Sequence, residues 1–141
     1  MKQWLFAPLM IALLSLAHCA PYPLPAGYAA APAHAFNVYF AFGSVALTDH
    51  DVALLRDVAA QAAGRPGTPI RVIGHADAPG APEGNAAISR RRTEIVAAEL
   101  SRFGVPRERM SLEAFGESRP AVVTTPGAMQ PENRRVEILI Y

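Results

Sequence analysis

Arg92 is the residue whose chemistry conflicts most with its position in the sequence. A helix over residues 85–103, at about 100° per residue, gathers its apolar side chains on one face, and Arg92 falls near the middle of that face. The apolar residues are Ile88, Ile95, Val96, Leu100 and Phe103. A guanidinium turned toward a core keeps its charge, so it needs a carboxylate, backbone carbonyls, a wet cleft or a ligand. Arg92 is therefore the first candidate site residue, whereas Arg90 and Arg91 point away from this face.

Asp77 is the candidate partner of Arg92. It comes shortly after Ile70–Ile73, a short apolar segment that predicts a strand running into Gly74. Because α/β folds place ligand sites at the carboxyl ends of parallel strands, we expect Asp77 and the first turns of the helix at the same rim. Two interpretations stay open from these residues alone. One is a ligand site that offers an anion and a cation, and the other is a structural Asp77–Arg92 ion pair that orders the loop.

The elements that position these two residues follow from the spacing of apolar side chains, which predicts four strands and two helices. In chain order they are a strand at 36–42, a helix between Thr48 and Gly64, a strand at 70–73, a helix at 85–103, and strands at 110–114 and 136–140. The first strand should carry four apolar side chains on one face, namely Phe36, Val38, Phe40 and Phe42.

Local signals mark where the helices begin and end. Thr48 and Asp51 have the spacing of a capping box at the start of the first helix. Asn85 is predicted to cap the second helix. Gly104 follows the last apolar residue of that helix and precedes Val105-Pro106, so we expect a left-handed backbone there.

The predicted order, β-α-β-α-β-β, contains no internal repeat. Helices between strands imply right-handed crossovers and parallel neighbours. Two helices can cover one face of a four-stranded sheet, and alternating strands agree with this, because a doubly covered sheet would show continuous apolar runs. The predicted fold class is therefore α/β, an α+β two-layer sandwich with two helices on one face of a four-stranded mixed sheet.

Composition and motifs argue against several function classes. The formal net charge of +1 gives no bulk electrostatic case for nucleic acid. The sequence contains no Gly-x-Ser-x-Gly, Walker or Gly-x-Gly-x-x-Gly motif. His75 and Asp77 could be two metal ligands, but no third ligand has suitable spacing, and Ser44 and His50 fit a turn and a helix start better than a catalytic pair. We therefore expect no enzyme, no cofactor and no metal.

Residues 1–19 predict an export signal that ends at Cys19. Lys2 supplies a positive charge, and the apolar stretch 4–16 is too short for a membrane span of about 20 residues. Cys19 is the only cysteine of the chain, and its position resembles the lipobox of bacterial lipoproteins, with His18 where a small residue is usual. Lipidation of Cys19 is the leading interpretation, and plain cleavage just after it or an uncleaved anchor are the alternatives.

The rest of the chain divides at residue 36. Residues 20–35 are rich in Pro and Ala without any period, so they predict an extended, semi-rigid linker. Residues 36–141 carry all the predicted strands and helices, and we expect them to form the one folded domain.

The order and spacing of residues in this domain resemble the OmpA-like family. The chain has Gly74-His75-Ala76-Asp77, Gly80 and Asn85-x-x-Ile88-Ser89-x-x-Arg92, where the family has Gly-His-Thr-Asp, Gly and Asn-x-x-Leu-Ser-x-x-Arg-Ala. The resemblance covers about 36–141 and includes Gly116-Glu117-Ser118-x-Pro120 and Asn133-Arg134-Arg135-Val136-Glu137. The departures are Ala41, Ala76, Ile88 and Thr93, and none of them removes Asp77 or Arg92.

This resemblance implies binding of peptidoglycan through the diaminopimelate of its stem peptide. It assigns the ligand's ammonium to Asp77 and the ligand's carboxylate to Arg92, whose planar fork suits a carboxylate in a way that lysine cannot copy. Candidate supporting residues are Asn85, Ser89, Arg134 and Arg135.

The resulting hypothesis is a non-catalytic tether between the outer membrane and the cell wall. The partners would be peptidoglycan and, through lipidated Cys19, the periplasmic face of the outer membrane, as the peptidoglycan-associated lipoprotein group implies. The alternative is a protein-interaction subunit of an envelope complex, of a secretion or Tol-like kind, with a vestigial wall-binding site.

Overall fold

The computed structural model describes residues 31–141, so the predictions for the export signal, for Cys19 and for most of the linker lie outside the described residues. The elements are β1 (His34–Tyr39), α1 (Asp49–Ala63), β2 (Ile70–Gly74), α2 (Pro82–Arg102), β3 (Met110–Ala114) and β4 (Arg135–Ile140). Two short 3-10 turns, η1 (Arg107–Arg109) and η2 (Pro131–Asn133), precede the last two strands. The predicted β-α-β-α-β-β order is confirmed.

The four strands form one mixed sheet in the order β1-β4-β2-β3. Strand β4 runs antiparallel to both of its neighbours, while β2 and β3 are parallel, with Val72 opposite Leu112. The expectation that each helix joins adjacent parallel strands is therefore correct for β2 and β3 only. Strand β4 lies between β1 and β2, so the connection through α1 passes over one strand position.

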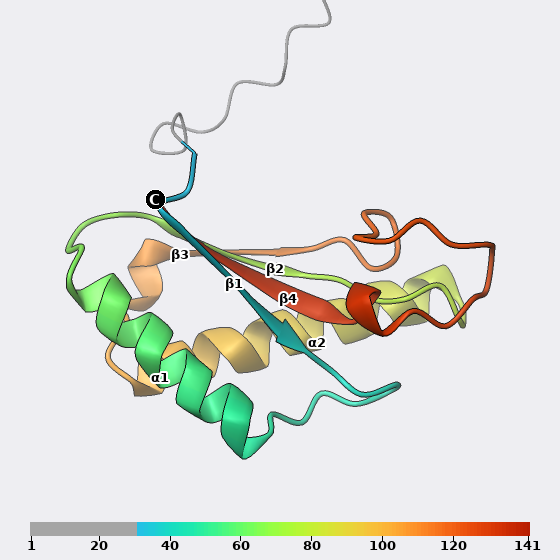
Figure 1. The fold of residues 1–141 in the computed structure, drawn as a ribbon, viewed down its shortest axis with the longest axis horizontal. Helices are drawn as coiled ribbons and strands as arrows, with labels where there is room; N and C mark the ends of the chain where they lie inside the picture. Colours follow the sequence, from blue (N-terminus) through green and yellow to red (C-terminus); the bar gives the residue numbers. More distant parts are fainter. Residues whose placement is uncertain (1–30) are drawn as a thin grey trace, which may run out of the picture.

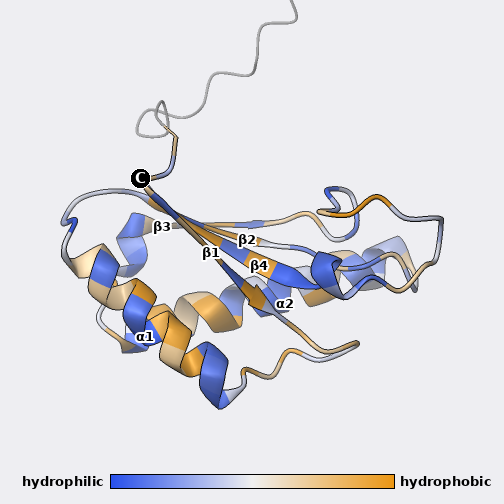
Figure 2. Ribbon diagram, viewed as in Figure 1, coloured by the Kyte–Doolittle hydropathy of each residue, from blue (hydrophilic) through white to orange (hydrophobic). Residues whose placement is uncertain are grey.

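Both helices lie on one face of the sheet, which confirms the predicted two-layer sandwich (Figure 1). The core between the layers takes alternate residues of the strands and one side of each helix, and Figure 2 shows apolar and polar residues following one another along these elements. Among its completely buried members are Val38, Leu55, Val58, Ile70, Val72, Val96, Leu100, Val136, Ile138 and Ile140. The other face of the sheet carries charged side chains that pair with one another. Arg71, for example, donates two hydrogen bonds to the Glu113 carboxylate.

The ends of the first strand differ from the prediction. Strand β1 begins at His34, two residues before the predicted domain boundary, and ends at Tyr39. Phe40 continues the apolar face into the core, but the chain turns after it and Phe42 is 55% exposed. Phe42 is therefore not a core residue, because the alternation that predicted its direction stops with the strand.

The start of the second helix also differs. Helix α2 begins at Pro82, with Ala81 at the cap position and no side-chain cap, so the prediction that Asn85 caps the helix is wrong. Proline suits this first position because its φ is already helical and its missing N–H would have no partner there.

The other predicted helix signals are confirmed. Thr48 forms the full capping box with Asp51. Gly104 has φ +93°, the left-handed backbone that its place after α2 predicted.

Candidate ligand-binding site

Asp77 lies in the loop that follows β2 and is almost completely buried, at 4% exposure. Backbone hydrogen bonds from His75 to Arg135 and from Ala76 to Gly116 hold this segment between two neighbouring chain segments. The Oδ2 atom of Asp77 accepts from Arg134 Nη1 at 3.0 Å and from the Gln130 backbone N–H at 3.4 Å. Its Oδ1 atom accepts no hydrogen bond from residues 31–141, so one carboxylate oxygen is available to a ligand.

Arg92 is 1% exposed, which confirms that the guanidinium turns toward the interior. It reaches three backbone carbonyls from two segments, the loop after β1 and the segment after β2: Nε donates to Ser44 at 2.9 Å, Nη2 to Ala41 at 3.1 Å and Nη1 to His75 at 3.3 Å. Its guanidinium also lies 5.0 Å from the centre of the Phe40 ring. A guanidinium has five N–H donors, so each terminal nitrogen retains one N–H for a ligand.

The structural alternative, an Asp77–Arg92 ion pair, is wrong, because the ion pair of Asp77 is with Arg134. Asp77 and Arg92 instead line the same cavity without bonding to each other. The cavity has a volume of about 110 Å³ and is completed by Phe42, Gly43, Pro79, Gly84, Asn85 and Ile88. An anion and a cation therefore face one partly open cavity, as the ligand-site interpretation requires.

Close packing of α2 on the end of β2 sets this geometry. A Cβ added at Gly74 would lie 2.2 Å from Thr93 Oγ1 and 2.3 Å from the Ser89 carbonyl, so only glycine lets the helix approach here. Ser89 is completely buried, donates to the Ala86 carbonyl and accepts from the Gly116 backbone N–H. The candidate supporting residue Ser89 therefore holds the helix to the loop after β3 and does not line the cavity.

The three remaining supporting candidates take different places. Asn85 lines the cavity, and its side-chain amide donates to Glu117. Arg134 bridges the Phe40 carbonyl and Asp77, so it orients the carboxylate from outside the cavity lining. Arg135 pairs with Glu137 and does not line the cavity.

Arg92 keeps the charge that a ligand would need, although its burial disfavours the charged form. Burial lowers the pKa of Arg92 to about 10, the charge of Asp77 raises it and the charge of Arg134 lowers it. Arg92 therefore keeps its charge at neutral pH. The cavity thus combines a cation of low hydration with one free carboxylate oxygen, an arrangement that suits a small zwitterion.

Sequence reasoning missed the loop after β1. The carbonyls of Ala41 and Ser44 bind Arg92, while Phe42 and Gly43 line the cavity. The resemblance to the OmpA-like family extends to Phe40-x-Phe42-Gly43-Ser44 in this loop, but these residue types do not indicate that their backbone carbonyls would bind Arg92.

Within residues 31–141, no three His, Cys, Asp or Glu side chains are grouped to hold a metal ion. No helix in this part of the chain is long and apolar enough to cross a membrane.

The fold and the site together define a two-layer domain with a charged cavity beside β2 and α2. Residues 39–134 match the OmpA family, and the chain belongs to that family.

Among its relatives, the peptidoglycan-associated lipoprotein of Pasteurella multocida is 36% identical over 105 residues, which are 74% of this chain and 69% of that protein. An outer membrane protein of Gluconacetobacter diazotrophicus is 34% identical over 78% of this chain, which spans only 31% of that longer protein. The solved structure of the peptidoglycan-associated lipoprotein from Burkholderia pseudomallei has a TM-score of 0.69 and 30% identity, and it covers 74% of this chain and 89% of its own.

Proposed function

We propose that this chain binds peptidoglycan without catalysis, and that its charged cavity takes the diaminopimelate of the stem peptide. The observation that carries the proposal is the placement of Asp77 and Arg92, both almost completely buried, on one cavity of about 110 Å³. Arg134 and backbone carbonyls satisfy these two charges only in part, because Asp77 Oδ1 and one N–H on each terminal nitrogen of Arg92 have no partner within residues 31–141. A ligand that brings one ammonium and one carboxylate would pair with these groups.

The free end of a diaminopimelate side chain has this chemistry, because it is an amino-acid centre with both charges. Its ammonium would donate to Asp77 Oδ1, since Oδ2 is already held by Arg134. Its carboxylate would accept from the N–H groups that remain on Arg92 Nη1 and Nη2. Pockets for drug-sized ligands have volumes of about 300–1,000 Å³, so this smaller cavity suits one amino-acid head group, not a sugar or a whole stem peptide.

The names of the relatives support the wider role. Proteins that are 34–36% identical are called peptidoglycan-associated lipoproteins in Pasteurella multocida and Haemophilus influenzae. We propose that the domain holds the cell wall, while acyl chains on Cys19 hold the periplasmic face of the outer membrane. The Pro- and Ala-rich residues between Cys19 and β1 would be the spacer between the two attachments.

Binding to purified sacculi, compared with calorimetric titration of free diaminopimelate, tests the proposal. Asp77→Asn keeps the size of the side chain and can still accept from Arg134, but it removes the charge that would attract the ammonium. We expect this variant to lose both interactions while remaining folded by circular dichroism. Arg91→Ala is the matched control, because Arg91 is exposed one position before Arg92 and does not line the cavity. Wild-type binding by folded Asp77→Asn would place the wall site elsewhere.

A further inference from the structure

Among the strands of residues 31–141, none pairs with the outer edge of β3, because β3 is the last strand in the order β1-β4-β2-β3. The Phe115 N–H donates to the Gly74 carbonyl, and Gly74 is opposite Ala114 in the parallel pair. In a parallel ladder, the backbone N–H and C=O groups of alternate residues face the same neighbouring strand. Those of residues 113 and 115 face β2, so the N–H and C=O groups of Leu112 and Ala114 point to the outer edge. Such an edge can accept one more strand.

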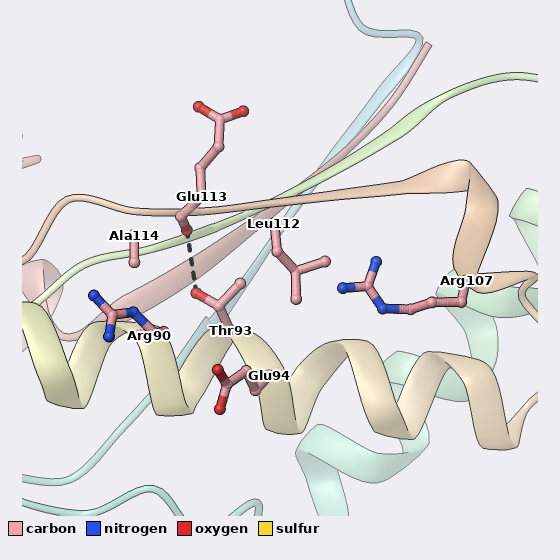
Figure 3. A pocket seen from close by; sticks show the side chains of 7 residues that line it. All are labelled: Arg90, Thr93, Glu94, Arg107, Leu112, Glu113 and Ala114. Atoms are coloured by element: carbon pink, nitrogen blue, oxygen red, sulfur yellow. Dashed lines mark hydrogen bonds between the residues drawn. The ribbon is translucent and has the colours of Figure 1, made fainter.

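A groove of about 350 Å³ runs along this edge, between β3 and α2. Leu112 and Ala114, both half-buried, contribute apolar surface from the strand, and Thr93 faces them from the helix. Figure 3 shows the Arg107 side chain extending along the groove toward Leu112, while the Arg90 guanidinium lies near Ala114. The groove thus has an apolar middle and a cation toward each end.

These cations are available to a partner. Arg90 is exposed and makes no hydrogen bond or ion pair within the part of the chain that the structure describes. Arg107 is exposed as well, and only its Nη1 donates, to the Met110 carbonyl at 2.9 Å. This contact occupies one end of the edge and leaves Leu112 and Ala114 open.

The carboxylates nearby do not cancel this charge. Figure 3 shows the Glu113 carboxylate on the side of β3 that faces away from α2. Arg71 donates two hydrogen bonds to this carboxylate. Glu94 also lines the groove, on the helix side, and forms no salt bridge with Arg90. Since two guanidiniums and one solvated carboxylate remain, the groove complements an acidic segment.

We propose that this groove is a second binding site, at which an extended acidic segment of a partner protein joins the sheet beside β3. The partner's backbone would pair with Leu112 and Ala114, and its carboxylates would meet Arg90 and Arg107. The site is separate from the proposed wall-binding cavity, because the two share no lining residue. A single domain could then hold the wall and a protein partner at the same time.

A synthetic peptide of alternating aspartate and valine, labelled with fluorescein, is the probe, and its lysine–valine counterpart is the peptide control. We expect the acidic peptide alone to bind in fluorescence anisotropy, and to protect the amides of Leu112 and Ala114 in hydrogen exchange measured by NMR. The double variant Arg90→Glu and Arg107→Glu should weaken binding by about tenfold or more, because attraction becomes repulsion. Arg91→Glu is the matched control, since it makes the same change on an exposed residue outside the groove.

The same double variant should bind sacculi like the wild type, which separates this proposal from the wall-binding proposal. Equal binding of the acidic and lysine peptides, unchanged affinity in the double variant, or no protection of the two amides would each overturn the proposed site. Failure of the acidic peptide to bind at millimolar concentration would overturn it as well.

Discussion

Arg92→Lys tests both roles that the structure assigns to Arg92. The guanidinium donates to three carbonyls that surround it, those of Ala41, Ser44 and His75. Lysine keeps the charge but has one nitrogen with three N–H groups, so it cannot span the same carbonyls and also offer a forked pair to a ligand. The variant therefore separates the planar shape of the side chain from its charge.

The expected magnitudes follow from the hydrogen bonds that lysine would lose. A hydrogen bond to a charged group contributes about 1.5–3 kcal/mol. Losing at least one of the three carbonyl bonds should lower the free energy of unfolding by about 2–3 kcal/mol. Losing one of the two bonds proposed for the ligand's carboxylate should weaken diaminopimelate binding roughly 10- to 100-fold.

Urea denaturation gives the first quantity, and calorimetric titration of diaminopimelate, at a temperature where the variant is folded, gives the second. Arg91→Lys is the control for both measurements and should change neither. Affinity within about twofold of wild type in Arg92→Lys would refute the carboxylate contact. Unchanged unfolding free energy would refute the role of Arg92 in bridging the carbonyls.

Three further predictions concern acid stability, backbone conformation and membrane attachment. Burial lowers the pKa of His75 to about 4, with the charge of Arg135 adding to the effect and Glu137 opposing it. Because the unfolded chain binds this proton near pH 6.5, the stability from neutral His75 is complete above that pH and is lost as the pH falls toward 4, by about 3 kcal/mol in all. Urea titrations at about pH 7 and pH 5 should show a smaller loss for His75→Phe than for wild type, and equal losses would contradict the assignment. Gly104→Val should lower the free energy of unfolding by about 1 kcal/mol or more because of the positive φ alone, since nothing lies within 4 Å of the added Cβ. Gly84→Ala is the control, because Gly84 lies in a helix with equal space around its Cβ, and this change should be neutral or stabilising. An unchanged thermal midpoint for Gly104→Val would refute this prediction. Cys19→Ser should leave an unprocessed or soluble protein, and a mature N-terminus beyond Cys19 without an acyl mass in the wild type would show that this cysteine is not the anchor.

Local sequence patterns determined the elements and the most unusual side chain. Alternation along strands and the three-to-four spacing along helices depend only on neighbours in the chain, so β2, β3, β4 and most of both helices could be predicted. The Thr48 capping box and the left-handed Gly104 were predictable for the same reason. The burial of Arg92 also followed from helical geometry alone, and Asp77 followed from its place after a strand.

Tertiary structure decided which of these groups meet. Asp77 pairs with Arg134, which is 57 residues away, and Arg92 binds carbonyls 48 and 51 residues away. Neither pairing has a local signal, because any buried arginine can be satisfied by a carboxylate or by carbonyls.

The insertion of β4 between β1 and β2 is the step that brings the site together. Strand β4 pairs with both of these strands, and Arg134, the residue just before it, binds the Phe40 carbonyl and Asp77. Strand order is set by the packing of whole elements and by closing of long loops, which alternation within one strand cannot specify. The sequence therefore predicted that Asp77 and Arg92 would lie at the same rim, and only the folded sheet decided that Arg134 would hold Asp77 and that backbone carbonyls would hold Arg92.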